Sequence, residues 1–137
     1  DKVYPYGMSF NPFNDKQIYF SSSNNLYFLD ISKINEIKED ETRDIDVSQS
    51  AFFSENKSVS NFCIFREGVN SSQKIAVAFY STETIPDTTE IKFYDIVNKN
   101  EEFTPILLEG AVNNMLYYDG YLLATNQSTQ EVFIKKL

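Results

Sequence analysis

A strand–turn–strand pattern recurs three times along this chain of 137 residues, and it favours a repetitive β architecture. The clearest copy occupies residues 74–95 (KIAVAFYSTETIPDTTEIKFYD), where two apolar stretches flank a polar loop that contains Pro86 and Asp87. Weaker copies precede it (QIYFSSSNNLYFLDI) and follow it (YLLATNQSTQEVFIKKL). Short apolar runs bounded by turn-forming residues are typical of β-strands, so the pattern predicts an all-β chain.

The predicted strands fall into three units, which cover residues 1–53, 54–109 and 110–137. The first two units have four strands each and the third has three, with one or two helical turns at most, in residues 33–41. The predicted strands are residues 4–10, 17–21, 26–31, 45–53, 59–65, 75–80, 90–96, 103–108, 112–118, 121–125 and 131–137. A spacing of about 40 to 50 residues matches one four-stranded blade of a β-propeller.

Several local signals place individual strands. Residues 75–79 are apolar on both faces, which predicts a strand in the middle of a covered sheet. Pro105 removes a backbone donor and therefore suits an edge strand. The Asp119–Gly120 pair predicts a tight hairpin with a type I′ turn. Cys63 is the only cysteine, which rules out an intrachain disulfide, and we expect it in a strand core.

Residues 89–96 (TEIKFYDI) resemble the third strand of a WD40 repeat, which ordinarily ends in Trp–Asp. Tyr94–Asp95 stands in the place of that dipeptide, and Leu29–Asp30 has the same place in the first unit. The third unit (VFIKKL) lacks the Asp, and the Gly–His pair of the family is missing because the chain has no His. The resemblance covers nearly the whole chain and is specific only at residues 89–96. It implies a partial β-propeller of about three four-stranded antiparallel blades.

A closed propeller takes at least about four blades. We therefore expect residues 1–137 to form a single β domain that is a segment of a larger propeller. The alternative is a single ten-stranded β-barrel or sandwich, which has the size of small ligand carriers. The propeller interpretation requires residues 75–80 and 121–125 to lie in different sheets.

Composition excludes several functions. The net charge of −8 argues against nucleic acid and against an anionic membrane as partners, because both are bound through Lys and Arg. No apolar run has the length of a membrane span. The lone cysteine and the lack of a recognisable signal peptide lead us to expect a cytoplasmic or nuclear protein.

The residues that enzymes ordinarily use are also missing. Without His there is no Ser-His-Asp or Cys-His system and no His-containing zinc site, and the isolated glycines form no phosphate loop. We expect no enzyme activity, cofactor or metal. Asp30 and Asp95 end strands and are expected to cap turns. Most of the tyrosines at positions 117, 118 and 121 are expected to pack between sheets, with a sugar or peptide groove as the alternative.

The resemblance implies that the loops joining second to third strands, and fourth to first strands, share one face and bind partners. Candidate partner-binding residues on that face are Thr82, Glu83, Asp87 and Thr88. The insertion of residues 33–46 is expected on the opposite face, where Glu39, Asp40 and Glu41 suit a basic partner. The sequence thus predicts a protein–protein interaction or scaffold module whose partners are other subunits or the remaining blades. The alternative is a carrier of small ligands.

Overall fold

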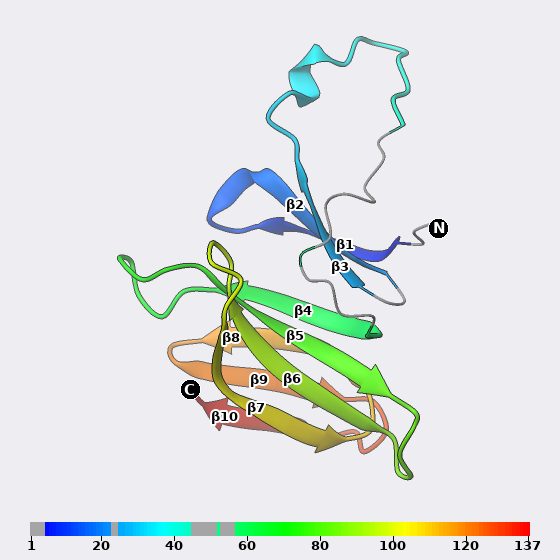
Figure 1. Cartoon of the computed structure of the whole chain (residues 1–137), viewed down its shortest axis with the longest axis vertical. Helices are drawn as coiled ribbons and strands as arrows, with labels where there is room; N and C mark the ends of the chain where they lie inside the picture. The colour runs from blue at the N-terminus through cyan, green and yellow to red at the C-terminus, as the bar shows by residue number, and fades with distance from the viewer. Residues whose placement is uncertain (1–4, 23–24, 45–51, 53–56) are drawn as a thin grey trace.

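The computed structural model describes residues 5–22, 25–44, 52 and 57–137, and these residues form three antiparallel sheets (Figure 1). The first sheet consists of β1 (Pro5–Asn11), β2 (Asn14–Ser22) and β3 (Asn25–Asp30). The middle sheet consists of β4 (Val59–Phe65), β5 (Lys74–Ser81), β6 (Thr88–Asp95) and β7 (Glu101–Glu109). The third sheet consists of β8 (Val112–Tyr118), β9 (Tyr121–Asn126) and β10 (Val132–Lys136). Within each sheet, every strand pairs with its neighbour in the chain, so the prediction of an all-β chain built from successive antiparallel sheets is confirmed.

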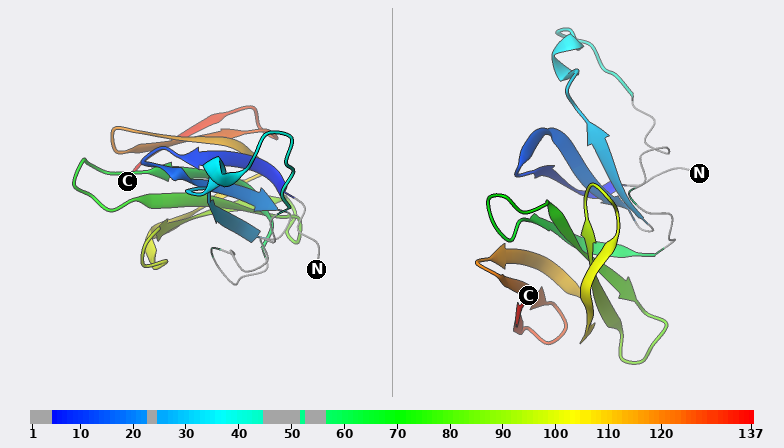
Figure 2. Two further views of the ribbon diagram at one scale, coloured as in Figure 1. Left: turned by 90° about the horizontal axis from the view of Figure 1, so that it is seen from above. Right: turned by 60° about the vertical axis from the view of Figure 1, so that its left-hand side comes forward.

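The three sheets are stacked as layers, with the middle sheet between the other two (Figure 2). Successive side chains of a strand point to opposite faces, so β5 contributes to both interfaces. Ile75, Val77 and Phe79 pack with Tyr19 and Leu26 of the first sheet. The alternate residues of β5 face the third sheet. The prediction that this strand is covered on both sides is confirmed, because residues 74–79 are all buried.

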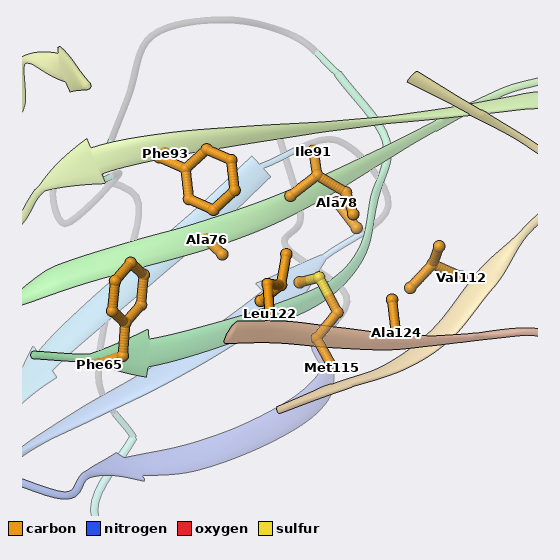
Figure 3. Close-up of a cluster of buried hydrophobic side chains, with 9 residues drawn as sticks. All are labelled: Phe65, Ala76, Ala78, Ile91, Phe93, Val112, Met115, Leu122 and Ala124. Atoms are coloured by element: carbon orange, nitrogen blue, oxygen red, sulfur yellow. The ribbon is translucent and has the colours of Figure 1, made fainter. Parts of the chain in front are cut away.

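The interface between the middle and third sheets combines small and large side chains (Figure 3). Its buried members are Phe65, Ala76, Ala78, Ile91, Phe93, Val112, Met115, Leu122 and Ala124. The alanines leave room for the two phenylalanine rings, which meet edge to face at a centroid distance of 6.4 Å. Phe65 also stacks on Tyr117 at 4.5 Å. Burial of these apolar side chains stabilises the packing of the third sheet on the middle sheet.

Local signals in the sequence located several elements correctly. β4 and β8 have the predicted bounds, and β7, which carries Pro105, is an edge strand of the middle sheet. Asp119 and Gly120 have φ values of 46° and 86°, as a type I′ turn requires. The expected helical turn is a short 3-10 helix, Ile34–Glu36. The predicted strand over residues 45–53 lies outside the described residues except for Phe52, whose backbone N–H donates to the Leu26 carbonyl of β3 at 2.7 Å.

One alternative, the closed barrel, and one expectation, the packing of the tyrosines, were wrong. A closed ten-stranded barrel is not found among the described residues, because the strands divide into three separate sheets and β5 and β9 lie in different ones. Most of the three tyrosines were expected to pack between sheets, but only Tyr117 does so. Tyr118 and Tyr121 are 70% and 40% exposed, because the alternation of β8 and β9 turns them to the outer face of the third sheet.

The first strands of the three sheets border a common groove of about 560 Å³. The side-chain amide of Asn61 on β4 donates to the backbone carbonyl of Asn113 on β8 at 3.3 Å, so these two strands are in direct contact. From β1, the exposed Met8 and Phe10 line the same groove. The sheets are therefore not only stacked but also aligned, with the first strand of each on the same side.

Candidate partner-binding site

Three loops meet at one end of the stack, where the turn between β5 and β6 lies (Figure 1). The backbone N–H of Gly110 donates to the carbonyl of Asp87 at 2.6 Å, which joins the β5–β6 loop to the β7–β8 loop. The N–H of Gln127 donates to the carbonyl of Ala111 at 2.9 Å, which joins the β7–β8 loop to the β9–β10 loop. The middle and third sheets thus present one continuous loop surface.

Thr89 fixes this loop surface from beneath. Its side chain is fully buried, and its hydroxyl donates to the Gly110 carbonyl at 2.6 Å. The same hydroxyl oxygen accepts from the Val112 N–H at 3.3 Å. A single side chain near the start of β6 therefore satisfies two backbone groups where the chain enters the third sheet, and this limits how far the loops can move relative to the sheets.

An open groove of about 600 Å³ lies beside the β5–β6 loop. Thr82, Glu83 and Thr88 line it, as predicted binding residues, together with Lys57 and Glu90. The Lys57 ammonium lies 3.9 Å from the Glu90 carboxylate and 5.3 Å from the centre of the Phe79 ring. The groove thus combines an exposed and a partly buried carboxylate, one ammonium, hydroxyls and an aromatic ring. This mixture suits a polar peptide surface better than a small apolar molecule.

Asp87 is placed differently from the other three candidates of this loop. Its carboxylate accepts a hydrogen bond from the Tyr80 hydroxyl at 2.5 Å, and this bond raises the pKa of Tyr80 above its usual value. The Asp87 carbonyl meanwhile accepts from Gly110. Asp87 therefore holds the loop in place, and the side chains available to a partner are those of its neighbours.

The acidic insertion lies at the other end of the molecule (Figure 1). Glu39, Asp40 and Glu41 are all exposed there. Glu41 accepts from the Lys38 N–H at 2.9 Å and from Arg43 at 2.6 Å, and these contacts lower its pKa, the Lys38 bond most. Asp40 has a φ of 62°, a conformation that Asp and Asn tolerate better than most residues. The seven predicted residues therefore lie on two separate surfaces: the loop surface and the acidic insertion.

Asp30 and Asp95 cap turns, as the sequence predicted. The Asp30 carboxylate accepts from the Ser32 N–H at 2.8 Å. The Asp95 carboxylate accepts from the N–H groups of Val97 and Asn98, each at 2.9 Å. The pKa of Asp95 is lowered, chiefly by the Asn98 bond. Both carboxylates thus accept backbone N–H groups of the turns that follow their strands.

Other candidate chemistry in the described part of the chain is limited. No group of three or more His, Cys, Asp and Glu side chains there could hold a metal ion. Cys63 is a free thiol on β4 whose pKa is raised by burial. Among the described residues, we find no helix with the length and apolar character needed to span a bilayer.

Two polar clusters were not predicted from the sequence. The buried Lys74 bonds the Glu102 carboxylate, lies 3.5 Å from that of Glu67, and has a raised pKa chiefly because of Glu102. The side-chain amide of Asn11 donates to Gln17 at 3.0 Å and to Gln73 at 2.7 Å, which links the first sheet to the middle sheet. The partners lie up to 62 residues apart, so no local pattern could reveal them.

Comparisons of this chain with protein-family models, with curated proteins and with solved structures each found no match.

Proposed function

We propose that this chain is a section of a WD40-like β-propeller that serves as a non-enzymatic protein–protein interaction or scaffold module in a larger protein or complex. The observation that carries the proposal is the stack of successive antiparallel sheets, whose middle member has four strands and is covered on both faces. In a propeller each blade likewise buries both faces against its neighbours. The Tyr94–Asp95 pair at the end of β6 fits the place of the family's Trp–Asp dipeptide.

The alignment of the first strands also supports a propeller. In a ring of blades, the first strand of every blade borders the central channel. Here β1, β4 and β8 border one groove, and β7 of the middle sheet is farthest from it in strand order. Loops that join equivalent strands then gather at the same end, which is the arrangement of the β5–β6 and β9–β10 loops.

Two surfaces are the proposed sites of contact. The loop surface would bind a partner through Thr82, Glu83 and Thr88 around the groove beside β5 and β6. The insertion would attract a basic partner through Glu39 and Asp40, for which no ion pair is found within the described ranges, unlike Glu41. The net charge of −8 favours such a partner by long-range attraction. The open grooves, and the division of the described strands into three separate sheets instead of a closed barrel, give no support to a carrier of small ligands.

The proposal is tested by identifying partners and mapping their contacts. The purified chain is used as bait in an extract of cells that express it, and each captured protein is then purified and titrated against the chain by calorimetry. Two variants with the same change in charge, Glu39→Lys and Glu83→Lys, probe the two ends of the molecule. A basic partner held at the insertion should lose about two- to fivefold in affinity with Glu39→Lys, the size expected for one exposed charge, and little with Glu83→Lys.

Each variant is the matched control for the other, since both exchange one exposed carboxylate for an ammonium. Asp40 is left unchanged because its positive φ would add backbone strain to most replacements. If no captured protein binds the purified chain directly, the interaction module is refuted. If partners bind but neither variant alters any affinity, both proposed surfaces are wrong.

A further inference from the structure

Arg66, at the start of the β4–β5 loop, is a half-buried cation for which no ion pair is found among the described residues. The other buried or half-buried basic residues in that part of the chain each form an ion pair with a glutamate: Lys57, Lys74 and Lys92. The Arg66 guanidinium instead lies over the Phe13 ring, 4.5 Å from its centre, and its Nη1 donates to the Val69 carbonyl at 3.5 Å. Its Nε is buried and has no hydrogen-bond partner among the described residues. A half-buried charge in this state lacks the anion that ordinarily accompanies it.

A pocket of about 330 Å³ lies beside this guanidinium, between the first and middle sheets. The loops that follow β4 and β6 border it together with β2, at the end of the stack opposite the β5–β6 turn (Figure 1). None of the residues that line the pocket is acidic. Ile96 and Val97 form the apolar part of its wall. Its polar part includes, besides Arg66, three side-chain amides: those of Asn14, Gln17 and Gln73.

Hydrogen bonds assign the orientation of all three amides. The Oδ1 of the buried Asn11 accepts the Phe13 N–H at 2.9 Å, so its Nδ2 is the atom that faces the two glutamines. That nitrogen donates to the Oε1 of Gln17 at 3.0 Å and to the Oε1 of Gln73 at 2.7 Å. The Oδ1 of Asn14 likewise accepts a backbone N–H at 3.0 Å. Each amide oxygen is thus in use, and each NH₂ group has no acceptor among the described residues.

The pocket therefore combines one cation with three amide donors whose oxygens are occupied. Such a set selects an anion, and the planar guanidinium fits a carboxylate in particular. A doubly charged anion is disfavoured, because the buried Asp95 carboxylate lies close by and accepts a hydrogen bond from the hydroxyl of Ser72 in the pocket wall. The net charge of −8 acts in the same direction.

We propose that this pocket binds the carboxylate of a small organic acid. Arg66 supplies the charge, the three amides donate to the carboxylate oxygens, and Ile96 and Val97 contact a short apolar body. The volume is at the lower end of the range for ligand sites, about 300 to 1,000 Å³. The site lies outside the loop surface and the insertion, so the inference goes beyond the function proposed above. The acid would be held at the surface between two layers, unlike the enclosed ligand of a carrier barrel.

Butyrate, with butyramide as its uncharged counterpart, tests the site by nuclear magnetic resonance titration of the isotope-labelled chain at constant ionic strength. We expect butyrate to shift the Nε–H signal of Arg66 and the NH₂ signals of Asn14, Gln17 and Gln73 along one saturable curve. The Kd should be on the order of 1 mM, as suits a ligand this small. Butyramide should shift none of these signals at the same concentrations.

Two aspartate variants isolate the contribution of the pocket. Asn14→Asp keeps the oxygen that accepts the backbone N–H and replaces the NH₂ donor by a second carboxylate oxygen, so it should weaken butyrate binding at least about tenfold. Asn113→Asp is the matched control. Asn113 is exposed on β8, and its Oδ1 accepts from the Thr125 hydroxyl at 2.6 Å, so the same charge is added outside the pocket. This control should keep the Kd within about twofold. Arg66→Gln should abolish saturable binding.

Shifts that rise linearly without saturation, equal binding of butyramide, or unchanged binding by Arg66→Gln overturn the proposal. Tighter binding of inorganic phosphate than of butyrate also overturns it, because the pocket would then select a tetrahedral oxyanion. If Arg66→Gln loses its dispersed amide spectrum, the comparison of Asn14→Asp with Asn113→Asp decides alone, and equal affinities of these two variants refute the site. The partner titrations are independent of each of these results, since no residue of the pocket belongs to either proposed contact surface.

Discussion

Asp95 shows how one side chain can set the geometry of a turn. It lies at the end of β6, is only 4% exposed, and accepts two backbone N–H groups of the following turn. Its backbone N–H and carbonyl also bond Asn100 and Lys99, so the turn closes around this residue. Asp95 stands at the Asp position of the WD40-like strand, and its place at the end of a predicted strand was enough to predict that it caps a turn. The Lys74 cluster could not be predicted, because its acidic partners come from other strands and loops.

Replacing Asp95 should change both stability and its dependence on pH. The folded pKa lies below the unfolded value of 3.8, so the ionised carboxylate stabilises the fold above that pH, and this contribution is lost as the pH falls through the folded pKa. Asp95→Ala should lower the free energy of unfolding by about 1 to 3 kcal/mol at neutral pH, because two backbone donors lose their acceptor. Asp95→Asn keeps an oxygen acceptor and should lose less.

The measurement is urea denaturation followed by circular dichroism between pH 2.5 and 7. Both variants should show a flatter loss of stability below pH 4 than the unaltered protein. An equally steep loss in Asp95→Asn would show that other carboxyl groups control the acid limb.

Turns define the ends of the hairpins, and two of them depend on glycine. Gly110 and Gly120 have φ values of 80° and 86°, which residues other than Gly rarely adopt. Gly120 belongs to the type I′ turn between β8 and β9, and nothing lies within 4 Å of the position where a Cβ would stand. At Gly110 such a Cβ would lie 2.8 Å from the side chains of Asn126 and Ser128. The first position is limited by backbone conformation alone, and the second by conformation and packing together.

The two alanine substitutions should therefore differ. Gly120→Ala should cost about 1 to 2 kcal/mol, the strain of a left-handed residue. Gly110→Ala should cost more, because the contacts between the β7–β8 and β9–β10 loops must also separate. Chemical denaturation of both variants under the same conditions measures the difference. Equal losses of unfolding free energy would show that the two loops can separate without further cost, and that the hydrogen bonds around Gly110 are not needed to position them.

Element bounds were predicted best where the signal is local. β4 and β8 each end in a continuous apolar run that is followed by polar or turn-forming residues, so their bounds agree with the sequence. β2 begins three residues before its predicted start, because its first three residues are polar although Asn14 already pairs with Asn11 of β1. Likewise, the groove that includes Lys57 and Glu90 depends on the placement of β4, β5 and β6 side by side. Pairing across strands adds information that no single stretch of sequence contains.

Stacking makes the molecule a series of layers, each attached to the next by an apolar interface. The hairpin repeat predicted the number of layers and their order. It could not show which side chains meet between layers, and for that reason most of the tyrosines at positions 117, 118 and 121 were expected in the interior, although Tyr118 and Tyr121 are exposed. In such a series, each layer contacts only its neighbours, so local stability can differ from one layer to another.

A substitution between layers should expose this property. Leu122→Ala removes a fully buried side chain from the interface of the middle and third sheets and should cost about 2 to 5 kcal/mol. Hydrogen exchange should then accelerate most in β8, β9 and β10 and least in β2 and β3. Leu107→Ala is the control, since Leu107 is 69% exposed on β7 and its truncation should cost less than about 0.5 kcal/mol. Uniform acceleration in all three sheets would show that the layers open as one unit.

Because β5 is buried on both faces, a substitution at any of its core positions disturbs the packing against a neighbouring sheet. A change at Ile75, Val77 or Phe79 alters the interface with the first sheet. A change at Ala76 or Ala78 alters the interface with the third sheet. Insertion or deletion of a single residue would turn the bulky side chains toward the third sheet and the alanines toward the first sheet, which would disrupt the packing at both interfaces. The core of this one strand is therefore where the chain should tolerate the least variation over evolutionary time, while the loops at either end remain free to diversify.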